Sequence, residues 1–179
     1  MDYQIAVPSY KRPHIVTTQT LQTLRDLGSD LSNVTVFTAN PEETAIYKTA
    51  TQAVGLDVNV VTGVPGLTAC RIWYNTEYYD KGARILNVDD DIAGIYGKTE
   101  NNKLAKYEGT LDALVEQGFG TCEEYGAKLW GLAAALNGLF LKNTTTVGLR
   151  YICGAFHGSY AGDPALCGAD REVQSSGED

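Results

Sequence analysis

The chain has 179 residues, 44% of them hydrophobic, and carries 14 Lys and Arg against 22 Asp and Glu, a formal net charge of −8. This length favours one domain with a buried core. The acidic balance excludes a generally basic nucleic-acid coat, but it is compatible with an anionic substrate held through a metal. We expect a cytoplasmic protein, because no apolar run approaches the roughly 20 residues of a membrane helix and no signal-peptide pattern opens the chain.

The first part of the chain alternates short β-branched, apolar runs with stretches of helical periodicity. Strands are predicted over 3–8, 34–38, 58–61 and 84–88, and helices over 17–27, 42–53 and 68–79 between them. Strands that alternate with helices predict an open, mostly parallel α/β sheet with flanking helices, of the nucleotide-binding type. Ligands of such sheets lie outside the carboxyl ends of the strands, so the loops that follow the strands are the places to search.

Beyond residue 91 the pattern becomes mixed. A hairpin is predicted over 92–108, short helices over 111–117 and 123–128, and strands over 129–132, 138–141 and 149–156. Gly118 and Gly120 are expected to break the helical stretch, and the composition from Gly158 onward predicts a loop. No linker divides the chain, so we expect a single domain over 1–179, with 1–91 and 92–179 as two lobes of one sheet.

Three adjacent carboxylates, those of Asp89, Asp90 and Asp91, follow the fourth predicted strand. Like charges repel, and in a cleft this arrangement is unfavourable unless a cation is present. Oxygen ligands suit Mg²⁺, Mn²⁺ or Ca²⁺. Asp89 and Asp91 lie on the same side of an extended chain, which makes these two the predicted metal ligands. The alternative is a solvated acidic turn without a role.

Two further loops offer groups that suit a nucleotide or its phosphates. After the first strand, Ser9 and Tyr10 supply hydroxyls, and Lys11 and Arg12 supply cationic donors; the alternative is a rigid surface turn. The glycine-containing loop 63–66 leads into a helix that carries Arg71, which suits either a phosphate or an ion pair with the aspartates. This loop is not a Walker A loop, because no Gly-Lys-Ser/Thr follows it.

The last third of the chain offers groups for an acceptor. His157 follows an apolar run and is either a metal ligand, an acceptor contact or a structural histidine. Glu178 or Asp179 suits the general base that an acceptor hydroxyl needs, with 170–172 as a rival acidic cluster. Trp130 suits the core or the underside of an acceptor site. The four cysteines form no CxxC pair, which argues against a zinc knuckle and favours reduced thiols.

The run Ile-Ala-Val-Pro-Ser-Tyr-Lys-Arg-Pro at 5–13, followed by a strand that ends in Asp-Asp-Asp, resembles the GT-A glycosyltransferases. In that fold a DxD-type motif binds a divalent metal and the diphosphate of a nucleotide sugar. The stretches 128–132 and 151–158 are similar to the phage and kinetoplastid glycosyltransferases associated with TET/JBP oxygenases. The terminal Ser-Gly-Glu-Asp looks like the beginning of that family's acidic motif near the acceptor. Because family members continue past this motif, we expect the acceptor half to be shortened at its end.

The resemblance implies a metal-dependent hexosyltransferase of the GT-A type. It would move a sugar from a nucleotide-diphosphate sugar to an acceptor hydroxyl, such as that of a hydroxymethylated pyrimidine in phage DNA. Residues 1–91 would bind the nucleotide sugar and 92–179 the acceptor. The implied site has Mn²⁺ or Mg²⁺ on Asp89 and Asp91, the donor on Pro8, Ser9, Tyr10, Arg12, Asn40, Gly66, Arg71, Asp89 and Asp90, the acceptor on Trp130 and His157, and Glu178 or Asp179 as the catalytic base.

Two other classes stay open. A nucleotidyltransferase of similar topology would also use paired carboxylates, together with a glycine-rich signature near the first strand that this sequence lacks. A non-catalytic nucleotide-binding module would keep the fold without the chemistry. A Ser-His-Asp hydrolase has little support, because the only histidines are His14 and His157.

Overall fold

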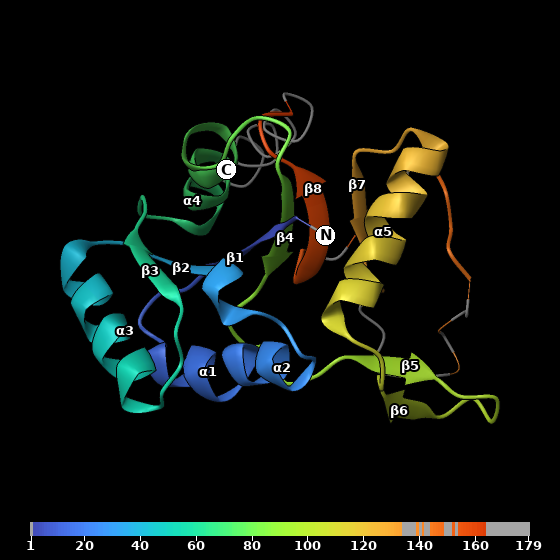
Figure 1. The fold of residues 1–179 in the computed structure, drawn as a ribbon, viewed down its shortest axis with the longest axis horizontal. Helices are drawn as coiled ribbons and strands as arrows, with labels where there is room; N and C mark the ends of the chain where they lie inside the picture. Colours follow the sequence, from blue (N-terminus) through green and yellow to red (C-terminus); the bar gives the residue numbers. More distant parts are fainter. Residues whose placement is uncertain are drawn as a thin grey trace, which may run out of the picture.

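The fold is built on a six-stranded sheet, shown in Figure 1 as a computed structural model that describes residues 2–133, 139, 141, 144–148, 152 and 154–163. The strand order is β3-β2-β1-β4-β8-β7. Strands β1 to β4 run parallel, and β8 is antiparallel to both β4 and β7. The predicted mostly parallel α/β class is confirmed. The strands are β1 (Gln4–Pro8), β2 (Val34–Thr38), β3 (Asn59–Thr62), β4 (Arg84–Val88), β7 (Leu129–Gly131) and β8 (Phe156–Tyr160).

Helices cover both faces of this sheet. The larger core packs one face against α1 (Pro13–Thr18), α2 (Thr20–Asp26), α3 (Pro41–Ala53) and α5 (Leu111–Tyr125). The smaller core packs the other face against α4 (Leu67–Trp73) and the π-helical turn η2 (Tyr74–Tyr78). A 3-10 turn, η1 (Leu31–Asn33), precedes β2. None of the helices in the described ranges has the length and apolar character needed to cross a membrane.

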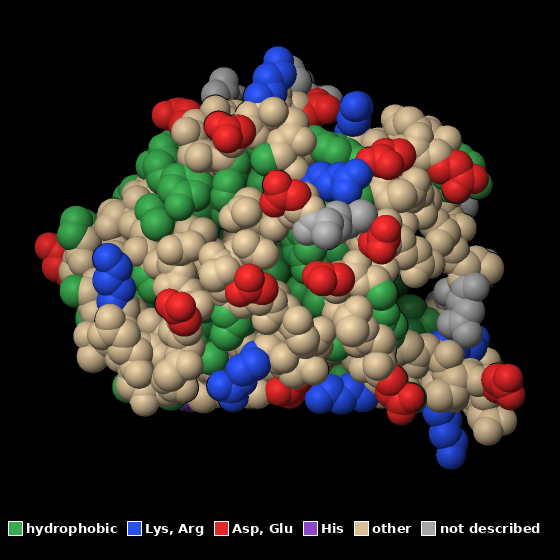
Figure 2. Space-filling view, viewed as in Figure 1, with side chains coloured by type: hydrophobic (Ala, Val, Ile, Leu, Met, Phe, Trp, Pro, Cys, Tyr) green, Lys and Arg blue, Asp and Glu red, His purple; other side chains and the backbone are tan. Residues whose placement is uncertain are grey.

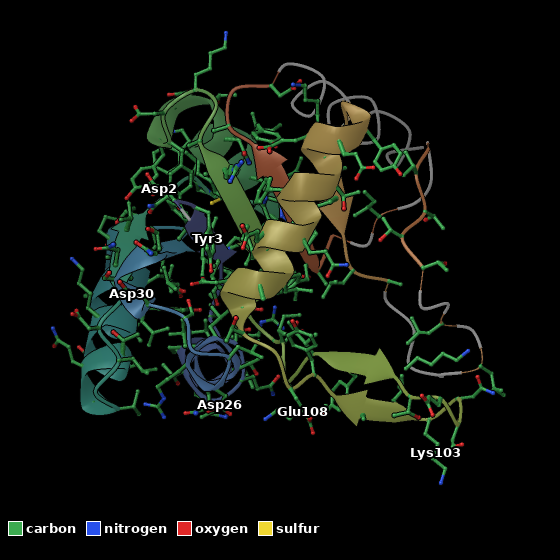
Figure 3. All side chains as sticks on the ribbon, turned by 45° about the vertical axis from the view of Figure 1, so that its right-hand side comes forward. Asp2, Tyr3, Asp26, Asp30, Lys103 and Glu108 are labelled. Carbon is green, nitrogen blue, oxygen red and sulfur yellow. The ribbon has the colours of Figure 1, made fainter. Side chains whose placement is uncertain are left out.

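A hairpin of β5 (Tyr96–Lys98) and β6 (Leu104–Lys106) forms a separate two-stranded sheet. It projects from the body of the molecule, and Lys103 lies at its outer end (Figures 1 and 3). Figure 2 shows acidic and basic side chains interspersed over the face that it draws. The predicted hairpin over 92–108 is confirmed.

The side chains of β4 alternate between the two cores, as the pleat of a strand requires. Leu86 and Val88 belong to the larger core, whereas Ile85 belongs to the smaller one. Asn87 also faces the smaller core, where it accepts a hydrogen bond from Tyr74. This alternation continues into the acidic turn and decides which face of the sheet Asp89 and Asp90 contact.

The predicted break at Gly118 and Gly120 is wrong, because α5 is continuous from Leu111 to Tyr125. Its apolar face buries Leu111, Val115, Phe119 and Cys122, a spacing that holds a helix against a sheet. A Cβ atom on Gly118 would lie 2.3 Å from the ring of Trp130. Glycine stands here because the helix packs closely on that ring, not because the helix ends.

Several other boundaries also differ from the prediction. Of the strand expected over 149–156, the described residues place Phe156 in a strand, β8, which continues through Gly158 to Tyr160, where a loop was expected. A Cβ atom on Gly158 would lie 2.0 Å from Trp130 Nε1, so this glycine too makes room for the tryptophan. The helix expected over 17–27 is divided at Gln19 into α1 and α2. Residues 138, 140, 149–151 and 153 lie outside the described residues.

Candidate functional site

The candidate site lies where β1 and β4 end side by side. After β1 the chain adds β2 and β3 on one side, and β4 then pairs with β1 on its other side. The strand order therefore reverses between β1 and β4, and open α/β sheets bind their ligands outside the carboxyl ends of the strands at such a reversal. The loop 9–12 follows β1, and the acidic turn 89–91 follows β4, so both lie at this edge of the sheet.

A closed ring of hydrogen bonds joins the two loops. Ser9 Oγ donates to Asp90 Oδ2 at 2.5 Å, and Arg12 Nη2 donates to Asp90 Oδ1 at 2.5 Å. The Tyr47 hydroxyl lies 2.7 Å from Ser9 Oγ and accepts from the backbone N–H of Arg12 at 2.9 Å. Because the Ser9 proton points at a carboxylate, which only accepts, Tyr47 donates to Ser9. The ring occupies both oxygens of Asp90, which is 2% exposed.

Helix α3 holds the loop 9–12 from one side. Lys11 has a φ of 55°, a left-handed conformation that is uncommon for a residue with a side chain. Its backbone N–H donates to Glu43 Oε2 at 2.9 Å, and Glu43 lies one turn before Tyr47 on the same helix face. Both are buried. Neither residue was predicted from the sequence as part of the site, although their i, i+4 spacing after the second strand was a usable signal.

The first aspartate is held by a different arginine. Arg71 Nη2 donates to Asp89 Oδ1 at 2.7 Å and to the carbonyl of Gly154 at 3.2 Å. The N–H of Asp89 donates to the carbonyl of Ala155 at 2.9 Å, so the turn before β8 fixes both partners. Burial raises the pKa of Asp89; Arg71 opposes this effect, and the charges of Asp91 and Asp90 add to it.

A second, more deeply buried contact fixes η2, which directly follows α4, against β4. Tyr74 donates to Asn87 Oδ1 at 2.7 Å, and Asn87 Nδ2 donates to Ser159 Oγ at 3.0 Å, all three being buried. Tyr74 lies one helical turn after Arg71, and Asn87 lies two residues before Asp89. The Tyr74–Asn87 and Arg71–Asp89 pairs therefore lie next to each other between the helical segment and the strand. The buried Tyr74–Asn87 pair helps to position the more exposed Arg71–Asp89 pair.

The third aspartate is the most accessible of the three. The Asp91 side chain is 51% exposed, and Arg12 Nη1 approaches its Oδ2 at 3.3 Å. Arg12 therefore spans Asp90 and Asp91, while Arg71 serves Asp89. Thr20, at the start of α2, fixes the backbone of the turn by donating to the carbonyl of Asp89 and accepting from the N–H of Ile92.

These carboxylates fit a divalent cation only in part. Among the residues that the structure describes, no three His, Cys, Asp or Glu side chains are grouped closely enough to hold an ion by themselves. Within the same residues, Asp89 bonds through Oδ1 and Asp91 through Oδ2, which leaves one oxygen of each available. Mg²⁺ in substrate sites commonly takes one or two carboxylates and completes its shell with water and phosphate oxygens, and two such oxygens meet this need.

The remaining donor-site residues have structural tasks of their own. The Asn40 side chain accepts from the N–H of Glu43 at 2.9 Å, which caps the N-terminus of α3. Gly66 precedes α4 with a φ of 90°, a conformation that favours glycine. Pro8 ends β1, pairing with Phe37. Tyr10 is exposed, and Lys11 Nζ lies 4.9 Å from the centre of its ring.

The two predicted acceptor residues lie on opposite faces of the sheet. Trp130 pairs with Gly158 and packs edge-on against Phe119 of α5. His157 is the neighbour of Gly158 on β8, so its side chain points to the α4 face. There its Nδ1 lies 2.9 Å from the carbonyl of Gly154, the same carbonyl that Arg71 contacts. The structure thus brings His157, but not Trp130, to the side of the sheet that carries Arg71.

The predicted catalytic residues Glu178 and Asp179, and the rival cluster 170–172, lie outside the described residues. A comparison of the sequence with protein-family models finds no match, and a comparison with curated proteins finds none either. A function is therefore inferred from the geometry of the site and from the sequence resemblance.

Proposed function

We propose that the protein is a metal-dependent glycosyltransferase that moves a sugar from a nucleotide-diphosphate sugar to an acceptor hydroxyl. The observation that carries the proposal is the meeting of the loop 9–12 and the acidic turn 89–91 at the junction of β1 and β4. That junction is where sheets of this order bind nucleotides. It combines carboxylates for a cation with arginines for phosphate, as the sequence resemblance to GT-A enzymes would require.

Asp89 and Asp91 are the proposed cation ligands, each with one oxygen to offer. A bound Mn²⁺ or Mg²⁺ supplies Lewis-acid stabilisation of the departing nucleoside diphosphate. Arg71 and Arg12 flank these carboxylates and suit phosphate oxygens, because a guanidinium binds them through two parallel hydrogen bonds. Asp90 acts indirectly, by fixing Ser9 and Arg12 from its buried position. The exposed ring of Tyr10 offers a surface on which a base can stack.

His157 is the better supported of the two acceptor residues, because it shares the carbonyl of Gly154 with Arg71. Trp130 instead fills the space between Gly118 and Gly158, as a core residue does. Glu178 or Asp179 remains the proposed base, on the sequence resemblance alone. A hydroxymethylated pyrimidine in phage DNA remains the proposed acceptor on the same basis.

A thermal-shift screen of nucleotide sugars with and without Mn²⁺ tests the proposal. We expect at least one nucleotide sugar to raise the melting temperature only when Mn²⁺ is present. Asp89→Asn and Asp91→Asn should abolish that shift. Asp57→Asn, which makes the same charge change at an exposed position in the loop before β3, should leave it intact. A shift that ignores both the metal and the two site variants contradicts the proposal.

Turnover of nucleotide sugars and nucleoside triphosphates then distinguishes a glycosyltransferase from the two other classes of protein. Release of free sugar or its transfer, dependent on Mn²⁺, supports a glycosyltransferase. Release of pyrophosphate from a nucleoside triphosphate favours a nucleotidyltransferase of similar topology. A metal-dependent shift with no turnover of any donor or triphosphate favours a non-catalytic binding module.

A further inference from the structure

Arg12 is bound unequally to two neighbouring carboxylates. Its Nη2 lies 2.5 Å from Asp90 Oδ1, while its Nη1 lies 3.3 Å from Asp91 Oδ2. Asp90 is 2% exposed and Asp91 is 51% exposed. The first contact is therefore short and partly buried, whereas the second is long and exposed to solvent, so the second is the one that a competing cation can replace.

The backbone of Arg12 keeps the residue in place if its outer contact is lost. The N–H of Arg12 donates to the Tyr47 hydroxyl, which belongs to the same hydrogen-bonded ring as Ser9 and Asp90. The guanidinium can thus release Asp91 while the main chain and Nη2 remain anchored. Only the Nη1 side of the guanidinium, which contacts Asp91, has to move.

Arg71 does not have this freedom. Its side chain is 20% exposed, less than half the value for Arg12, and Nη2 is shared between Asp89 and the carbonyl of Gly154. A Cβ atom on Gly154 would lie 3.2 Å from Arg71 Nη1, so the guanidinium also packs closely on the turn before β8. The two arginines that neutralise the acidic turn therefore differ, one being fixed and the other exchangeable.

We propose that Arg12 is the exchangeable counter-cation of Asp91, released from that carboxylate when a divalent cation binds the acidic turn. The inference rests on the proposed cation site of Asp89 and Asp91. Arg12 and the cation compete for the same carboxylate charge, so Arg12 weakens cation binding in the absence of substrate. When no cation is present, Arg12 offsets the charge of Asp90 and Asp91 while Arg71 offsets that of Asp89, which limits the repulsion among the three carboxylates.

Mn²⁺ binding, followed by the electron paramagnetic resonance signal of the free ion and with no nucleotide present, tests the inference. Arg12→Gln should bind Mn²⁺ roughly fivefold more tightly than the unmodified protein, since one opposing charge near the site is removed. Arg25→Gln is the matched control, because it removes the same charge from an exposed position on α2 where the side chain contacts Gln22. Its Mn²⁺ affinity should be unchanged.

Arg12→Gln also removes the cation that pairs with the buried Asp90, so this variant can fail to fold. A second variant is therefore needed. Arg12→Lys keeps the charge for Asp90 but cannot span both carboxylates. Its Mn²⁺ affinity should fall between those of the unmodified protein and Arg12→Gln. Mn²⁺ should also raise the melting temperature of Arg12→Gln by more than it raises that of the unmodified protein.

The outcomes distinguish failure of the Arg12 exchange from failure of the proposed cation site. If Mn²⁺ binds the unmodified protein, and Asp89→Asn loses it, but neither Arg12 variant binds more tightly, the exchange is wrong and the cation site stands. If Mn²⁺ binds the unmodified protein and Asp89→Asn alike, or binds neither, the proposed cation site itself is wrong and the exchange falls with it.

Discussion

Ser9 donates a hydrogen bond to Asp90 across the junction between β1 and β4, where the order of the parallel strands reverses. This contact joins two segments that are far apart in the chain at the place where an α/β sheet binds its ligand. The middle residue of the acidic turn is therefore a structural anchor. Its neighbours Asp89 and Asp91 are each hydrogen-bonded to an arginine through one carboxylate oxygen.

The Tyr47 hydroxyl is expected to stabilise the fold through the loop 9–12. Tyr47→Phe removes the donor to Ser9 and leaves the N–H of Arg12 without its acceptor. We expect a loss of about 1–3 kcal/mol in the free energy of unfolding, measured by urea denaturation. Tyr125→Phe makes the same change at an exposed position and should have little effect. Equal losses in the two variants would argue against the hydrogen-bonded ring.

Two glycines of α5 provide a matched pair. Gly118→Ala places a methyl group against the ring of Trp130, whereas a Cβ atom on Gly120 meets nothing within 4 Å. We expect Gly118→Ala to destabilise the protein by about 1–3 kcal/mol through overpacking. Gly120→Ala should stabilise it by about 0.5–1 kcal/mol, because alanine is the better residue in a helix interior. Thermal or urea unfolding measures both, and stabilisation by both substitutions would contradict the packing of Trp130.

Asn40 is expected to act on stability through its cap. Asn40→Ala should lower the free energy of unfolding by about 0.5–2 kcal/mol, and Asn40→Ser should restore most of it, because serine also accepts from the first turn of a helix. Circular dichroism during urea unfolding measures the effect. If the serine variant is as unstable as the alanine variant, the side chain has another task.

Buried tyrosines are expected to make the fold sensitive to alkali. Burial is the largest cause that raises the pKa of Tyr3, Tyr47, Tyr74 and Tyr79. A group whose folded pKa is raised keeps its proton longer in the folded state, so the contribution of these tyrosines to stability is constant below the ordinary tyrosine value of 10.0 and falls as the pH rises above it. This contribution is therefore lost in strongly alkaline solution.

Absorbance at 295 nm and circular dichroism, followed together against pH, check this expectation. A late fraction of the tyrosine ionisation should coincide with the loss of helical signal. Tyr74→Phe should reduce that late fraction. Complete ionisation of the tyrosines while the circular dichroism is still native would contradict the burial of these rings.

The sheet was predictable because the local composition of its parallel strands is typical of strands. The runs at 34–38 and 84–88 are apolar and β-branched, and the structure has strands at both. The place of the acidic turn at the end of the fourth strand follows from the same pattern. The division of the aspartates was not predictable, because it depends on α3 and α4 packing on opposite faces of the sheet.

Glycine explains most of the errors in the second half. Gly118 and Gly158 carry the composition of a break or a loop, but each faces Trp130 from a different element. Their role lies in a contact between α5, β7 and β8 that no local pattern contains. Because a loop was predicted from Gly158 onward, the pairing of β8 with β7 was not expected. It is this pairing that places Trp130 and His157 on opposite faces of the sheet.

The placement of the tryptophans has a practical consequence. Trp73 and Trp130 are the two tryptophans of the chain. Trp73 packs with the smaller core, and Trp130 packs with the larger one. Replacing either ring with phenylalanine leaves a single tryptophan, whose emission reports on one helical layer. Intrinsic emission from the two single-tryptophan proteins can therefore reveal whether the α4 layer and the α5 layer melt together or in sequence.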